Sequence, residues 1–252
     1  MSAVPSMTPA VWTVVEATLP VLVGCYRLND NVDANAVAVG LGGGKLLLLS
    51  PPSPRDGEAL HKALAAGCPG LPQGGEVIAI ATPSKGHTAG IAAAAARWPR
   101  AQIYAPADAL RVVKRLLPAG RAVEPLSQLA SALPASISLT LPPHQRLSDV
   151  VGRFRTDAGT VWYVNDLVTN LSRLPDPWPL RTLLGLLGFA TGLRPNRFAW
   201  RRRIVSDPGA LSAWFARELA MAPPLALVVG HGPPIFDPDA LAGLAETIDT
   251  LR

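Results

Sequence analysis

Four side chains with metal-binding chemistry follow apolar, strand-like runs of this 252-residue sequence. His87 follows "EVIAIAT", Asp166 ends "GTVWYVND", and His231 comes directly after "LALVVG". His144, in "LPPHQ", follows "SISLTLP". Because ligands in open α/β sheets gather beyond the carboxyl ends of strands, we expect these side chains to lie near one another.

Imidazole and carboxylate groups are the usual ligands of catalytic zinc or non-haem iron, which needs three protein ligands and one open position. His87, Asp166 and His231 meet that count, and His144 is a candidate fourth ligand. The only other histidine, His61, falls on the face of a predicted helix and is expected at the surface. The residues alone leave open whether the site holds one zinc or iron ion or no metal.

The elements that must position these groups begin with four strand-like runs and a glycine turn, followed by alternating strands and helices. The early strands are expected at 13–19, 21–28, 35–41 and 45–50, with the turn at 42–44. Later strands are expected at 76–82, 101–106, 136–142, 150–156, 159–166 and 225–230. Helices are expected from Pro54 to Gly67 and over 88–97, 107–117, 179–203, 207–220 and 237–252.

This order predicts sheets faced by helices. Neither an internal repeat nor a linker is visible, so we expect a single domain spanning 1–252. A helical, basic insertion is expected at about 175–205 within that domain.

The order of elements and motifs resembles the metallo-β-lactamase fold superfamily. "HTAG" (87–90) is similar to the end of that superfamily's HxHxDH motif, "YVNDLVTN" (163–170) to its aspartate motif, and "VVGHGPPI" (228–235) to its last histidine. The resemblance runs from about Asn35 to Ile235. It implies an α/β (α+β) fold, the four-layer αβ/βα sandwich, with metal sites at one edge.

The chain departs from the superfamily within the first motif. Alignment of His87 with the last histidine of HxHxDH puts Thr82 and Ser84 at the positions of the first two histidines, and Gly86 at that of the aspartate. Neutral hydroxyls are poor zinc ligands. An "SPP" turn at 50–52 also stands where the superfamily has an aspartate-containing turn. The resemblance therefore implies a branch with a degenerate motif and at most one metal ion.

The implied activity is that of a hydrolase acting on an unknown ester, thioester or phosphoester. His87, His231 and the bridging Asp166 would hold the metal, and His144 would be an outer ligand or a proton carrier. Ser84, with Thr82, would hydrogen-bond the attacking water, and Lys85 would orient an anionic group of a small-molecule substrate. The alternative is a non-catalytic, metal-free relative that uses the fold to bind a ligand or a protein partner.

Other classes of function find less support in the sequence. "GLGGGK" (40–45) fails the spacing of both common nucleotide-binding loops, and no G-x-S-x-G occurs. The net charge of +5 comes with only four lysines and no basic stripe, so nucleic-acid binding is not expected. The basic run 194–203 is interpreted as solvated or ion-paired, with contact of 180–203 with a membrane surface as the alternative.

The location in the cell is predicted to be cytoplasmic. Two cysteines form no disulfide framework, and the N-terminus lacks the pattern of a signal peptide. The apolar run 180–193 is shorter than the roughly 20 residues that a spanning helix needs. The substrate and the oligomeric state are not determined by these patterns.

Overall fold

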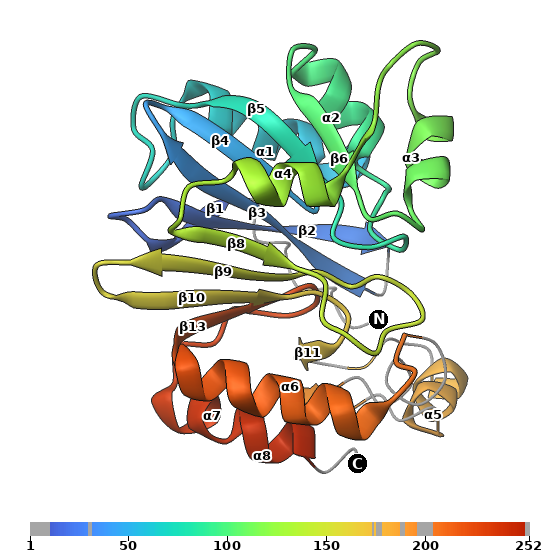
Figure 1. The fold of residues 1–252 in the computed structure, drawn as a ribbon. Coiled ribbons are helices and arrows are strands. Elements are labelled where there is room, and N and C mark those ends of the chain that lie inside the picture. Colours follow the sequence, from blue (N-terminus) through green and yellow to red (C-terminus); the bar gives the residue numbers. More distant parts are fainter. Residues whose placement is uncertain are drawn as a thin grey trace, which may run out of the picture.

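Two β-sheets lie face to face in the computed structural model, and helices cover the outer face of each sheet (Figure 1). The structure describes residues 11–29, 32–172, 174, 178–186, 190–195 and 204–249. The layers run helix, sheet, sheet, helix. This arrangement confirms the αβ/βα sandwich that the sequence predicts.

The first sheet has seven strands that pair in chain order. They are β1 (Trp12–Glu16), β2 (Val21–Asn29), β3 (Val32–Gly42), β4 (Lys45–Leu49), β5 (Glu76–Ala81), β6 (Gln102–Ala105) and β7 (Glu124–Pro125). Strands β1 to β4 are antiparallel, and β4 to β7 are parallel. The turn between β3 and β4 requires glycine, since Gly42, Gly43 and Gly44 have φ angles of 86°, 58° and 73°.

The second sheet brings together strands that are distant in the sequence. Its order is β13 (Pro224–Val229), β10 (Gly159–Val164), β9 (Val151–Thr156) and β8 (Ile137–Thr140). Strands β10 and β13 are parallel neighbours, so their carboxyl ends lie at the same edge. A separate two-stranded sheet pairs β11 (Val168–Leu171) with β12 (Gly192–Pro195).

The helices divide between the two outer faces. On the first sheet lie α1 (Pro54–Ala66), α2 (Ile91–Arg97) and α3 (Leu110–Leu116), and on the second α6 (Pro208–Met221), α7 (Pro238–Ala242) and α8 (Leu244–Asp249) (Figure 1). Helix α4 (Leu126–Ala132) contacts β6, β7 and β8 and so bridges the sheets, while α5 (Trp178–Leu186) precedes β12. None of the helices that the structure describes is long and apolar enough to cross a membrane.

Some predicted elements are corrected by the structure. The helix expected at 237–252 is two helices that meet at Gly243. The stretch 179–203, expected to be helical, contains α5 and then the strand β12, whereas its basic end at 196–203 lies outside the described residues. Strands β7 and β11 and helix α4 were not predicted, because their apolar runs are too short to show a period.

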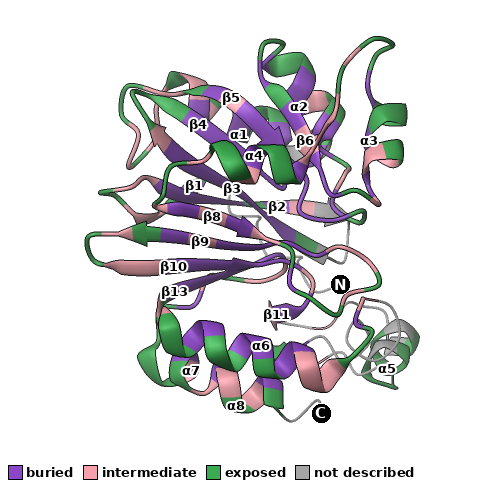
Figure 2. Cartoon of the chain, in the orientation of Figure 1, coloured by how far each residue is buried: buried purple, intermediate pink, exposed green. Residues whose placement is uncertain are grey.

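Hydrophobic residues fill three layers, one between the sheets and one under each set of helices (Figure 2). Strand β4 shows how the sequence builds them. Leu46 and Leu48 pack toward α1 and α2, while Leu47 and Leu49 pack toward the second sheet. A run of four leucines is therefore buried on both faces, which is the pattern of an interior strand. Each buried leucine contributes about 2 kcal/mol from the hydrophobic effect.

Gly90, which precedes α2, gives a test of how tightly the loop after β5 packs. A Cβ at this position would lie 2.1 Å from the carbonyl oxygens of both Pro51 and Pro52. We expect Gly90→Ala to lower the free energy of unfolding, measured in urea, by about 2 kcal/mol or more, because backbone atoms must shift.

The matched control is Gly185→Ala in α5, where an added Cβ meets nothing within 4 Å. The free energy of unfolding of this variant should be unchanged or higher by up to about 1 kcal/mol, because alanine has a higher helix propensity than glycine. Equal effects of the two substitutions would contradict the packing described here.

Candidate metal centre

Three of the predicted ligands meet where β5, β10 and β13 end. His87 lies in the loop between β5 and α2, Asp166 follows β10 and His231 follows β13. Their ligand atoms all lie within 4.8 Å of one another. His87 is buried, and the other two are half-buried, so the group faces a partly open edge.

His144, the fourth candidate ligand, is not part of this group. It is exposed on the loop between β8 and β9 and has a φ angle of 60°. The structure therefore brings together three of the four candidate ligands. The role of His144 as an outer ligand or proton carrier is still a prediction.

Both histidines contact the same carboxylate oxygen. Nε2 of His87 lies 3.1 Å from Oδ1 of Asp166, and Nε2 of His231 lies 3.3 Å from that atom. Four ligands placed tetrahedrally around zinc at normal bond lengths are about 3.3 Å apart. The donor set and these two spacings therefore fit one zinc or iron ion.

The tautomer of His231 strengthens this fit. Its Nδ1 lies 2.8 Å from the carbonyl oxygen of Asp33, which can only accept, so Nδ1 carries a hydrogen. Nε2 of the neutral ring then has a lone pair directed at Oδ1 of Asp166, which is also an acceptor. Two acceptors at 3.3 Å require a cation between them. That cation is either a proton or a metal ion.

The electrostatics of the group agree with this requirement. Burial raises the pKa of Asp166, but the charge of His87 and hydrogen bonds from His231 and His87 outweigh it and hold the pKa well below its ordinary value. Burial lowers the pKa of His231, yet the hydrogen bond and charge of Asp166 outweigh burial and raise it. The carboxylate thus stays ionised and attracts positive charge.

A second carboxyl group, Asp149, lies directly behind Asp166 and was missed in the sequence. Its Oδ2 accepts hydrogen bonds from the backbone N–H groups of Asp166 and Leu167, at 3.0 and 2.9 Å. Burial and the nearby charge of Asp166 raise the pKa of Asp149 to about 8. In the sequence, Asp149 comes just before the apolar strand β9, whereas the candidate ligands all follow strands.

Thr82, Ser84 and Gly86 shape the loop that follows β5. The Thr82 hydroxyl lies 2.8 and 2.6 Å from the carbonyl oxygens of Ser84 and His87 and shares its one hydrogen between them. The Ser84 oxygen accepts from the backbone N–H of Gly86. A Cβ at Gly86 would lie 3.7 Å from Oδ2 of Asp166, so this glycine faces the carboxylate and leaves the space beside it open.

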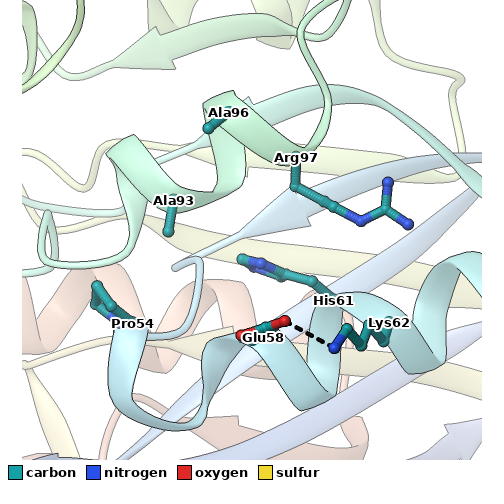
Figure 3. Close-up of a pocket in the computed structure, with 7 residues that line it drawn as sticks. All are labelled: Pro54, Glu58, His61, Lys62, Ala93, Ala96 and Arg97. Carbon is teal, nitrogen blue, oxygen red and sulfur yellow. Dashed lines mark ion pairs between the residues drawn. The ribbon is translucent and has the colours of Figure 1, made fainter.

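The prediction that His61 lies at the surface is wrong. Helix α2 covers this face of α1, and His61 is only 3% exposed, with its ring edge-on to Trp98 at 4.8 Å. Burial and the charge of Arg97 lower its pKa to about 4, so the ring is neutral. It lines a cavity of about 420 Å³ between α1 and α2, together with Pro54, Glu58, Lys62, Ala93, Ala96 and Arg97 (Figure 3).

Several solved structures are similar to this chain over nearly its whole length. The metallo-β-lactamase FIM-1 from Pseudomonas aeruginosa, in its mono-zinc form, has a TM-score of 0.60 at 14% identity, covering 98% of this chain and 96% of that one. A metallo-β-lactamase from Erythrobacter litoralis has a TM-score of 0.61 at 14% identity, covering 98% and 99%.

A flavodiiron core is similar as well. The Flv1 core from Synechocystis sp. PCC6803 has a TM-score of 0.59 at 12% identity and covers 96% of this chain and 61% of that one. No protein-family model matches the sequence, and neither does any curated protein. At these identities the similarities establish the fold alone.

The raised pKa of Asp149 predicts a pH effect on stability. Because folding raises this pKa from 3.8 to about 8, the folded chain keeps a proton that the unfolded chain releases. The contribution of Asp149 to the free energy of unfolding therefore falls as the pH rises through this window. We expect Asp149→Asn to remove that fall.

Urea unfolding of both metal-free proteins at several pH values between about 4 and 9 measures the effect. Asp166 and His231 titrate in both proteins, so the difference between the profiles contains the titration of Asp149 together with its effect on the neighbouring Asp166. Parallel profiles would contradict the assignment.

Proposed function

We propose that this chain, which has the metallo-β-lactamase fold, is a hydrolase that uses a single zinc or iron ion held by His87, Asp166 and His231. The observation that carries the proposal is the pair of Nε2 atoms that face one oxygen of Asp166. Since the His231 ring hydrogen is committed to Asp33, the arrangement requires a cation at this point.

The bound ion would act as a Lewis acid and lower the pKa of a water molecule at its open position. The two histidines provide neutral nitrogen ligands, and Asp166 provides the negative charge. Gly86 leaves room beside the carboxylate for water or substrate. Lys85, which precedes Gly86 in the chain, is exposed and would orient an anionic part of an ester, thioester or phosphoester.

The degenerate motif supports one ion rather than two. Thr82 and Ser84 have neutral hydroxyls that already take part in hydrogen bonds of the loop. Exchange of those bonds for a metal would leave buried loop carbonyls and an amide without partners, which is costly. A second ion would therefore lack a ligand set.

A second candidate function is a metal-free binding protein. It is favoured by the same ion pair, because a proton on His231 satisfies both acceptors without a metal. In that case the edge that carries the three residues would bind a ligand or a protein partner.

Metal content distinguishes the two candidates. Protein purified without chelator should hold about one zinc or iron ion per chain by elemental mass spectrometry. His231→Ala and Asp166→Ala should each lose the ion, since two remaining ligands bind weakly. His144→Ala is the control and should retain it, because His144 lies outside the group. Absence of metal, with no thermal shift on addition of zinc or iron, would rule out the hydrolase.

Hydrolysis is the next expected outcome. Metal-loaded protein should cleave at least one ester, thioester or phosphoester of a chromogenic panel. Asp166→Ala should reduce the rate at least about 100-fold, because it removes the anionic ligand and with it the activation of water. A rate that survives both chelation and this substitution would come from another site or a contaminant.

A further inference from the structure

The cavity between α1 and α2 contains a buried polar group that has no partner in the described part of the chain. His61 extends from α1 toward α2, and Nε2 of its buried ring lacks a hydrogen bond to any residue that the structure describes (Figure 3). A buried nitrogen without a partner is costly, so in a native protein it calls for a molecule from outside the chain, a ligand or water. His87, Asp166 and His231 do not line this cavity, so it is separate from the candidate metal centre.

The charged side chains that line the cavity favour an anion. Nζ of Lys62 lies 2.7 Å from Oε1 of Glu58, so these two charges offset each other. Arg97 has no acidic partner among the residues that the structure describes, and its guanidinium lies 5.9 Å from the centroid of the Trp98 ring. Burial, together with the positive charge of Arg97, lowers the pKa of His61 to about 4. The cavity thus holds one uncompensated positive charge near the buried ring.

His61 and Arg97 can both donate hydrogen bonds at neutral pH. A pKa of about 4 makes the His61 ring neutral, and a neutral imidazole has one hydrogen, which Nε2 can carry. The guanidinium of Arg97 has five N–H donors in a planar fork that matches a carboxylate. The two oxygens of a carboxylate only accept, so one carboxylate between these facing helices gives a partner to both groups.

The rest of the lining has room for an apolar body. Pro54 begins α1, and Ala93 and Ala96 of α2 line the same cavity with short apolar side chains (Figure 3). The volume of about 420 Å³ falls within the range of about 300–1,000 Å³ that is typical of small-molecule sites. The side chains of Glu58 and Lys62 are 76% and 70% exposed, and an exposed ion pair contributes little to stability, so both can move aside to admit a ligand.

We propose that the cavity between α1 and α2 binds a small organic acid. The carboxylate of the acid accepts hydrogen bonds from the Arg97 guanidinium and from Nε2 of His61. Its alkyl or aryl body lies against Pro54, Ala93 and Ala96. This lining favours such an acid over inorganic phosphate, which has no apolar part. The site is independent of the proposed function, because none of the three candidate metal ligands lines the cavity.

Histidine ring NMR of the metal-free protein tests this site. The chain has four histidines, and His61→Phe, which keeps an aromatic ring at this buried position, assigns the His61 signals. Butyrate and benzoate, added at neutral pH, should shift the ring signals of His61 in ¹H–¹³C spectra. Benzamide has the shape of benzoate without its charge and should bind at least about tenfold more weakly. Inorganic phosphate should also bind more weakly than benzoate.

Two matched pairs of variants locate the binding site. Arg97→Gln removes the guanidinium and should weaken benzoate binding at least about tenfold. Arg100→Gln removes the same charge from an exposed residue that does not line the cavity, and it should leave the affinity unchanged. Ala96→Leu, at an exposed position of the lining, should prevent binding because it fills the cavity. Ala92→Leu, at an exposed position of α2 outside the lining, should not.

The outcomes that would overturn the proposal are distinct. If neither butyrate nor benzoate shifts the His61 signals, the cavity holds water only. Shifts confined to His87 and His231 would place the carboxylate at the candidate metal centre instead. Equal affinities of Arg97→Gln and Arg100→Gln would overturn the role of Arg97, and equal binding of phosphate and benzoate would overturn the choice of an organic acid. Because the protein is metal-free, none of these results depends on whether the chain binds zinc or iron.

Discussion

The parallel pairing of β10 with β13 is the constraint on which the candidate metal centre depends. The two strands pair from Thr160 with Pro224 to Val164 with Val229, and both end at the same edge. Asp166 and His231, 65 positions apart in the printed sequence, each come two residues after those ends. A slip of one residue in this register would turn every side chain of β10 to the opposite face and separate the two groups. The apolar core on both faces of β10 prevents that slip.

Asn35 of β3 links the first sheet by hydrogen bonds to the edge of the second sheet where β10 and β13 end. Its backbone N–H donates to the carbonyl oxygen of Gly230, and its side chain donates to those of Val229 and Gly232. These bonds bring the Asp33 carbonyl oxygen to His231 and so set the tautomer of that ring. The two sheets therefore share one polar seam at the site, where a buried network is stable only if each member has a partner.

The polar groups of this seam include the neutral hydroxyls of Thr82 and Ser84 and the amide of Asn165. A site for two metal ions would need further imidazole and carboxylate groups. Ser84 accepts a hydrogen bond from Asn165, whose amide also donates to Asp149. These polar groups thus hold the loop and the backbone of Asp166 in place. The chemistry left at the surface of the seam is one carboxylate with two histidines.

The sequence alone determined the strands with strong apolar patterns and the helix α6 with its N-cap Asp207, because these elements depend on local patterns. It also determined three residues of the candidate site, because each of them follows the end of a strand. Only the tertiary structure decided the rest. The burial of His61 depends on where α2 packs, and the places of Ser50 and Asp149 depend on loops that fold over the site from different strands. Single polar residues in turns carry no periodic signal, so their partners become visible only when the two sheets have come together.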